Sequence, residues 1–200
     1  MHLLCKRFFA YARAKYPAYF DGPNRIAEFG SLNRNGTVRT FFTGWTTYIG
    51  VDIRSGAMVD LISAAKDHPF ASESFDVVVS SSMFEHDPEW RLSLDAMLRC
   101  LKPTGILVLT WGGAYNEPHQ EGEIPFSPLP GFQVVYFLGA RSIHVHECCY
   151  DRDLPNYRRF SPPRPPKPNE SINLIAFKDA TIPTTPRRLC GFDVKDRSDD

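Results

Sequence analysis

The sequence predicts an α/β fold: a doubly wound, Rossmann-like, mostly parallel sheet with an antiparallel edge hairpin. From Arg25 onward, short apolar runs alternate with loops and helical stretches. The runs at 77–79 and 106–109 are nearly continuous, as expected for strands buried on both faces. An amphipathic stretch lies between these two runs, and strand, helix, strand in that order indicates a right-handed parallel crossover.

Composition and charge limit the class of protein. With 200 residues, 42% hydrophobic and 23% charged, the chain fits one domain with its own core. We expect an N-terminal helical segment at 1–24 that packs on the domain or covers its site. The domain follows at 25–196, with a cofactor-binding half at 25–111, an irregular half at 112–196 that closes the sheet and faces the acceptor, and a loose tail at 197–200.

The charge balance and the cysteines bear on partners and location. Basic and acidic residues number 23 each, so the chain lacks the positive excess of a protein that binds nucleic acid through phosphates. The five cysteines are odd in number and show no repeated CxxC spacing, which argues against a disulfide framework. No signal peptide or membrane span is recognisable, so we expect a cytoplasmic protein without a membrane partner.

The elements follow one another in a regular order. Residues 3–16 form a basic amphipathic stripe, which predicts a helix ending before Pro17; such a helix can lie on a membrane, but packing on the sheet is commoner. A second helix is expected from Pro88 to Leu101. The Pro-rich stretch 161–168 is expected to be an extended connector. The expected strands are 25–29, 48–52, 59–63, 75–80 and 106–111, with 132–138 and 172–178 as the antiparallel pair.

The first two strands carry the chemical signal. Glu28-Phe29-Gly30 ends the first strand, and glycine at this point lets a ligand approach the backbone. Asp52 ends the second strand in Gly50-Val51-Asp52. An acidic residue about 20 residues past a glycine loop can accept hydrogen bonds from both ribose hydroxyls of a nucleoside.

Four further motifs follow in order: Asp67-His68-Pro69-Phe70, Ser74-Phe75-Asp76-Val77-Val78, Phe84-Glu85-His86 and Leu101-Lys102-Pro103-Thr104-Gly105. With these motifs, the chain resembles the class I S-adenosylmethionine-dependent methyltransferases, closest to their small-molecule type. The resemblance covers roughly residues 25–111. It departs from the usual pattern in two places: no glycine closely follows Gly30, and Ser63-Ala64-Ala65 stands where many relatives have an aspartate.

The resemblance implies S-adenosylmethionine as cofactor and methyl transfer to a small-molecule acceptor. It places Gly30 and Ser31 at the methionine end, where Glu28 braces the loop and binds the amino group. Asp52 would hold the ribose. The remaining cofactor contacts that it implies are Ile53, Ala65 and Lys66 around the adenine, and Ser80 and Ser81 beneath the sulfonium.

The resemblance places Glu85 and His86 next to the methyl group, as candidate catalytic residues. Alignment of acceptor and methyl supplies much of the acceleration in such a displacement, and a base is needed only if the acceptor must lose a proton early. His86 is the candidate base and Glu85 its orienting partner. Alternatively, Glu85 caps the following helix and His86 packs against the cofactor. The acceptor pocket is expected at Trp111, Tyr115, Asn116, His119 and 144–150.

Other interpretations stay open at this point. A metal site at His144, His146 and Cys148 is conceivable, since alternate strand residues share a face, but a buried strand is the favoured interpretation and no metal is expected. A degenerate domain that binds without turnover would also explain the two departures. A nucleotide-sugar or NAD enzyme with the same architecture is a third option, since fold does not settle chemistry.

Overall fold

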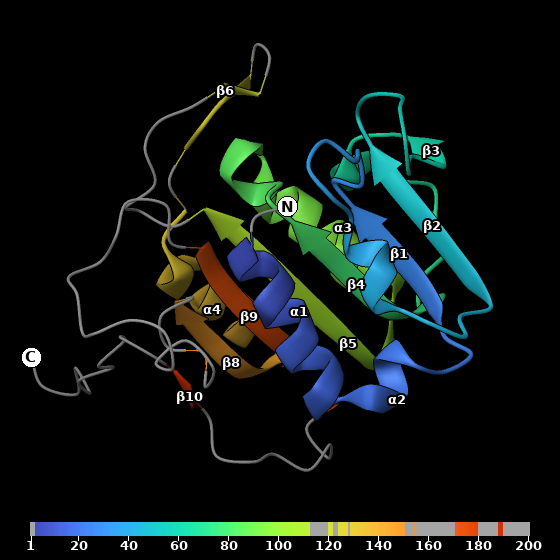
Figure 1. Ribbon diagram of the computed structural model, residues 1–200. Helices are drawn as coiled ribbons and strands as arrows, with labels where there is room; N and C mark the ends of the chain where they lie inside the picture. Colours follow the sequence, from blue (N-terminus) through green and yellow to red (C-terminus); the bar gives the residue numbers. More distant parts are fainter. Residues whose placement is uncertain are drawn as a thin grey trace, which may run out of the picture.

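A single eight-stranded sheet organises the computed structural model, which describes residues 3–112, 120–121, 124–127, 129–150, 154, 171–179 and 188–189. The strand order is β10-β8-β9-β5-β4-β1-β2-β3. Helices α1 (Leu3–Lys15) and α2 (Pro17–Phe20) cover one face, and α3 (Trp90–Cys100) and α4 (Gly131–Gly139) cover the other (Figure 1).

The parallel half confirms the predicted fold class. Its strands are β1 (Arg25–Phe29), β2 (Thr47–Asp52), β3 (Leu61–Ile62), β4 (Phe75–Ser81) and β5 (Leu101–Gly112). Within this half, neighbouring strands pair in parallel, and the carboxyl ends of β1, β2, β4 and β5 lie along one edge (Figure 1). Short 3-10 helices occupy three connections: η1 (Val38–Phe41), η2 (Ala65–Asp67) and η3 (Phe84–His86). Helix α3 joins β4 to β5, as the sequence predicted.

The antiparallel half contains one wrong prediction. Strand β9 (Ser171–Phe177) is antiparallel to both β5 and β8, but its partner β8 is His144–Tyr150, not 132–138. Residues 132–138 belong to helix α4, whose Val134, Phe137 and Leu138 are buried. The run is apolar almost throughout, and an all-apolar run does not distinguish a strand from a buried helix by periodicity. Three short strands complete the structure: β6 (Gln120–Glu121), β7 (Ile124–Pro125) and β10 (Arg188–Leu189).

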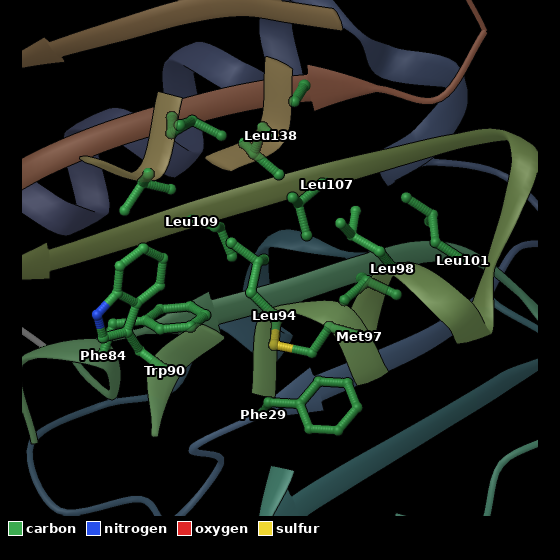
Figure 2. Close-up of a cluster of buried hydrophobic side chains, with 14 of the residues drawn as sticks. Phe29, Phe84, Trp90, Leu94, Met97, Leu98, Leu101, Leu107, Leu109 and Leu138 are labelled. Atoms are coloured by element: carbon green, nitrogen blue, oxygen red, sulfur yellow. The ribbon is translucent and has the colours of Figure 1, made fainter. Parts of the chain in front are cut away.

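The larger core lies between the sheet and helices α3 and α4. Leu94 and Met97 of α3 are fully buried and face Leu107 and Leu109 of β5, beside Phe29 of β1 (Figure 2). Burial of each such side chain contributes about 1.5–3 kcal/mol to folding. This packing fixes the position of β1, β4 and β5 relative to α3, and therefore the position of their carboxyl ends.

Helix α1 packs on the opposite face. Cys5, Phe8, Phe9 and Ala12 are fully buried against the sheet. The Tyr11 hydroxyl donates a hydrogen bond of 2.9 Å to Glu147 of β8, and Lys15 forms an ion pair with the same carboxylate. Within the described part of the chain, no helix is long and apolar enough to cross a membrane.

Candidate functional site

The loop after β1 meets the tip of β2 at the carboxyl edge. Gly30 has a φ of +77°, and its N–H donates to the Val51 carbonyl oxygen at 2.9 Å. The Leu32 N–H donates to Asp52 Oδ2 at 3.1 Å. Gly30 and Asp52 therefore lie on the same edge of the sheet and are joined through Leu32.

Asp52 keeps hydrogen-bonding capacity for a ligand. Its second oxygen, Oδ1, accepts from the Arg54 N–H at 3.1 Å. A carboxylate offers about four acceptor sites, so one backbone donor on each oxygen leaves room for two hydroxyl groups. The side chain is partly exposed. This geometry suits a ribose, although the two amides already compete for it.

Glu28 lies below the loop, at the end of β1. It is buried and accepts a hydrogen bond of 2.8 Å from the hydroxyl of Tyr48 on β2. Burial raises the pKa of the Glu28 carboxyl to about 7, although the hydrogen bond from Tyr48 opposes this. A buried carboxyl with a raised pKa gains from a nearby cation, such as an ammonium group.

Two buried hydroxyl groups mark the site as suited to a polar ligand. Ser31 Oγ and Ser80 Oγ have no hydrogen-bond partner within the described part of the chain, and their residues are 2% and 0% exposed. An unsatisfied buried polar group is costly, so native proteins leave few of them. These serines are where a bound cofactor of the expected kind would find partners, so the residues fit it.

The predicted adenine contacts divide into an exposed and a buried set. Ile53 is 50% exposed beside Asp52 and offers an apolar surface. Lys66 extends to α3, where it forms an ion pair of 3.1 Å with Glu89. Ala65, in contrast, is buried in the core under α3, so only its backbone can border a ligand.

The predicted methyl side lies at the ends of β4 and η3. Ser81 is in register with Thr110 of β5, and Cys5 Sγ of α1 lies 3.9 Å from Thr110 Oγ1, which brings the first turn of α1 to this edge. The ring of His86 packs at 6.1 Å from that of Phe126.

Glu85 is buried, and its carbonyl oxygen accepts from the Ser127 N–H at 2.6 Å. Helix α3 begins at Trp90 with Glu89 in the capping position. Glu89, and not Glu85, therefore occupies the N-cap position of this helix.

Strand β8 contradicts the expected alternation of His144, His146 and Cys148. The pairing of β8 with β9 shifts register between Val145 and Glu147. As a result, the centroid of the His146 ring lies 4.5 Å from that of Phe177, on the face of the sheet that α1 covers. Cys148 belongs to the core on the α3 face. The predicted buried strand is confirmed, and among the described residues no three metal-ligating side chains gather.

Sequence reasoning missed two residues that contact the glycine loop or Asp52: Leu32 and Met83. A Cβ on Gly30 would lie 2.8 Å from Met83 Cβ, so this methionine packs directly on the loop. Such contacts join segments far apart in sequence, and no local pattern indicates them. Of the predicted acceptor-pocket residues, Tyr115, Asn116 and His119 lie outside the described residues, whereas Trp111 is buried and donates to the Leu129 carbonyl oxygen.

The surface is hollowed between α3 and α4. This hollow of about 360 Å³ is lined by Arg91, Phe132 and Tyr136 among others. None of the predicted site residues lines it.

The fold defines the class of structure: the chain has the fold of the class I S-adenosylmethionine-dependent methyltransferases. Residues 35–109 match the family model described as a methyltransferase domain. No curated protein matches the sequence.

Solved structures show the same fold. The chain is 13% identical to 1,6-didemethyltoxoflavin-N1-methyltransferase from Burkholderia thailandensis, solved with 1,6-didemethyltoxoflavin and S-adenosylhomocysteine; the TM-score is 0.62, and the match covers 87% of this chain and 77% of that one. A putative S-adenosylmethionine-dependent methyltransferase from Listeria monocytogenes has a TM-score of 0.62 at 8% identity, covering 88% and 99%. The [4+2]-cyclase SpnF has a TM-score of 0.60 at 14% identity, covering 84% and 80%.

Proposed function

We propose that this chain binds S-adenosylmethionine at the carboxyl edge of its sheet and transfers the methyl group to a small-molecule acceptor in the cytoplasm. The observation that carries the proposal is the junction of the glycine loop with Asp52 through the Leu32 N–H. This junction puts two features on one edge: the Gly30 backbone, which a ligand can approach closely, and the carboxylate of Asp52. A nucleoside with a flexible tail requires both. The family match over 35–109 supports the same cofactor.

The chain's own residues would bind and orient. Asp52 would accept the ribose hydroxyls, Ile53 would pack against the adenine, and Gly30 would let the tail of the cofactor approach the backbone. When bound, the cofactor supplies an electrophilic methyl group on a sulfonium. Ser80 and Ser81 lie beneath the expected position of that group, and much of the acceleration would come from alignment.

His86 is the proposed base. It lies at the end of η3 beside Phe126, on the side of β4 where the acceptor is expected. A neutral imidazole can take the proton that the acceptor loses, and such transfer contributes about 10²–10⁴-fold. Glu85 is proposed to orient His86. The formal charge of zero favours a small acceptor over a nucleic acid.

Calorimetric titration with S-adenosylhomocysteine tests the cofactor. We expect micromolar binding that Asp52→Ala abolishes. Asp76→Ala is the matched control, because Asp76 also accepts a backbone N–H, that of Arg25 at 2.9 Å, but at the opposite end of the sheet. Equal loss in both variants, or no binding by the wild type at millimolar ligand, would contradict the proposal.

The rival function is a domain that binds partners without turnover. One contact favours it: a Cβ on Gly56 would lie 2.3 Å from Leu32 Cδ1, so Leu32 packs over the loop after β2. Absence of cofactor binding would select this rival. If the cofactor binds, His86→Ala should reduce methyl transfer to an acceptor found by screening while leaving cofactor affinity intact; unchanged turnover would exclude the base.

A further inference from the structure

The connection between β1 and β2 contains no long helix. In doubly wound folds, the loop after the first strand usually leads into a helix whose N-terminus holds an anionic group with its N–H donors and partial positive charge. Residues 30–46 contain only η1, a 3-10 helix of 4 residues. An anionic ligand group at this corner therefore needs another donor.

Arg39 in η1 is the cation at this corner. Its guanidinium stacks over the Tyr48 ring at 4.4 Å, and Nη2 pairs with Asp60 Oδ2 at 2.6 Å and reaches the Met58 carbonyl oxygen at 3.4 Å. The Nε atom is buried and has no partner within the described residues. Because a guanidinium has five N–H donors in a planar fork, Arg39 can hold Asp60 and still bind a carboxylate.

Gly50 explains why these groups gather so tightly. A Cβ at this position would lie 2.0 Å from the Met58 carbonyl oxygen and 2.7 Å from Ser31 Oγ. Asp60 Oδ2, the partner of Arg39, also accepts from the Gly50 N–H at 2.8 Å. In the sheet register Gly50 lies beside Glu28. Ser31, Glu28 and the Arg39–Asp60 pair therefore surround one glycine.

We infer that Arg39 supplies the carboxylate contact in a subsite for a zwitterionic α-amino acid group, which, if the proposed function holds, is the methionine end of the cofactor. Arg39 binds the carboxylate beside Glu28 and Ser31, which the family resemblance already implies at this end. Glu28 would bind the ammonium, and Ser31 Oγ is buried with no partner among the described residues. A cation and a carboxylate close together match a zwitterion, whereas a nucleoside alone needs neither. Arg39 thus takes the role of the absent helix N-terminus.

Two ligands that differ only in this group test the inference. S-adenosylhomocysteine carries the amino acid end, and 5′-methylthioadenosine has the same adenosine and sulfur without it. We expect Arg39→Ala to weaken the affinity for S-adenosylhomocysteine by about 10- to 100-fold, which corresponds to the loss of one charged hydrogen bond. The affinity for 5′-methylthioadenosine should change by no more than about 2-fold. Arg39→Lys should lie between.

Control variants separate ligand binding from a structural role. Asp60→Asn breaks the ion pair but keeps Arg39, so it should preserve the preference for S-adenosylhomocysteine. Arg13→Ala removes an ion pair of the same length, 2.6 Å to Asp21, on α1, and should change neither affinity. Thermal melts followed by circular dichroism show whether Arg39→Ala folds; Arg39→Gln, which keeps part of the stack on Tyr48, replaces it if not.

The outcomes are distinct. If Arg39→Ala lowers the affinity for both ligands to the same degree, the subsite is overturned because Arg39 then only positions the loop. The same holds if Asp60→Asn lowers the affinity for S-adenosylhomocysteine as much as Arg39→Ala does. Unchanged binding of both ligands also overturns it. If the wild type binds neither ligand, the proposed function itself fails, and the assignment of this zwitterion fails with it.

Discussion

The Tyr48 hydroxyl donates a hydrogen bond of 2.8 Å to Glu28 Oε2 and so joins β1 to β2 directly beneath the glycine loop. A second contact at this corner is the ion pair between Arg39 and Asp60. Because Glu28 is buried, its protonation links the stability of this corner to pH and to the charge of any bound ligand.

Glu28 should make the protein less stable as pH rises. Its pKa is raised from 4.5 to about 7 in the folded chain, so between these pH values the unfolded chain releases the Glu28 proton while the folded chain keeps it, which favours unfolding. The free energy of unfolding should therefore fall by on the order of 3 kcal/mol as pH rises, and the fall is complete above about pH 7. Urea unfolding of the wild type and Glu28→Gln across this range measures it.

Comparison at each pH is needed because His68 acts in the opposite direction. Burial lowers its pKa from 6.5, so its contribution is lost as pH falls below that value. The difference between Glu28→Gln and the wild type isolates Glu28, whose charged neighbours are Arg39, Asp60 and Asp52. A difference that does not change with pH would contradict this prediction.

Ligand binding should release a proton from Glu28. An ammonium beside the carboxyl favours its ionised form, so S-adenosylhomocysteine should expel up to about one proton at about pH 6. Calorimetric enthalpies in buffers of different ionisation enthalpy reveal this release as a slope. Glu28→Gln should abolish the slope, and a wild-type slope of zero would show that the ammonium lies elsewhere.

Gly30→Ala should distort the loop. The φ of +77° costs an L-residue about 1–2 kcal/mol, and the new Cβ would lie 2.8 Å from Met83 Cβ. Gly139→Ala is the control: at the end of α4, its added Cβ meets nothing within 4 Å, so stability should stay or rise slightly. Urea midpoints compare the two, and similar midpoints would argue against the strained loop.

The core under α3 should be the main source of stability at the site. Leu94→Ala removes a fully buried side chain and should cost about 2–5 kcal/mol, whereas Leu92→Ala, at a residue 54% exposed on the same helix, should change stability by less than about 0.5 kcal/mol. Chemical denaturation measures both. A small loss for Leu94→Ala would mean that the core relaxes around the cavity.

The sequence by itself determined the parallel half of the sheet and the edge that carries the site. Continuous apolar runs such as 77–79 and 106–109 can be satisfied only by burial on both faces, and the spacing from Gly30 to Asp52 follows from one strand, one connection and the next strand. Patterns of this kind depend only on residues that are close together in the sequence, so they can be recognised without coordinates.

Tertiary structure decided the rest. Residues 132–138 form a helix because a run that is apolar except for Gln133 suits either form, and packing against β8 selected the helix that buries Val134, Phe137 and Leu138. The cluster of Arg39, Asp60 and Ser31 around Gly50, and the contact of Met83 with Gly30, join segments that are separated along the chain. Contacts of this kind depend on the three-dimensional path of the backbone, and residue order alone does not encode them locally.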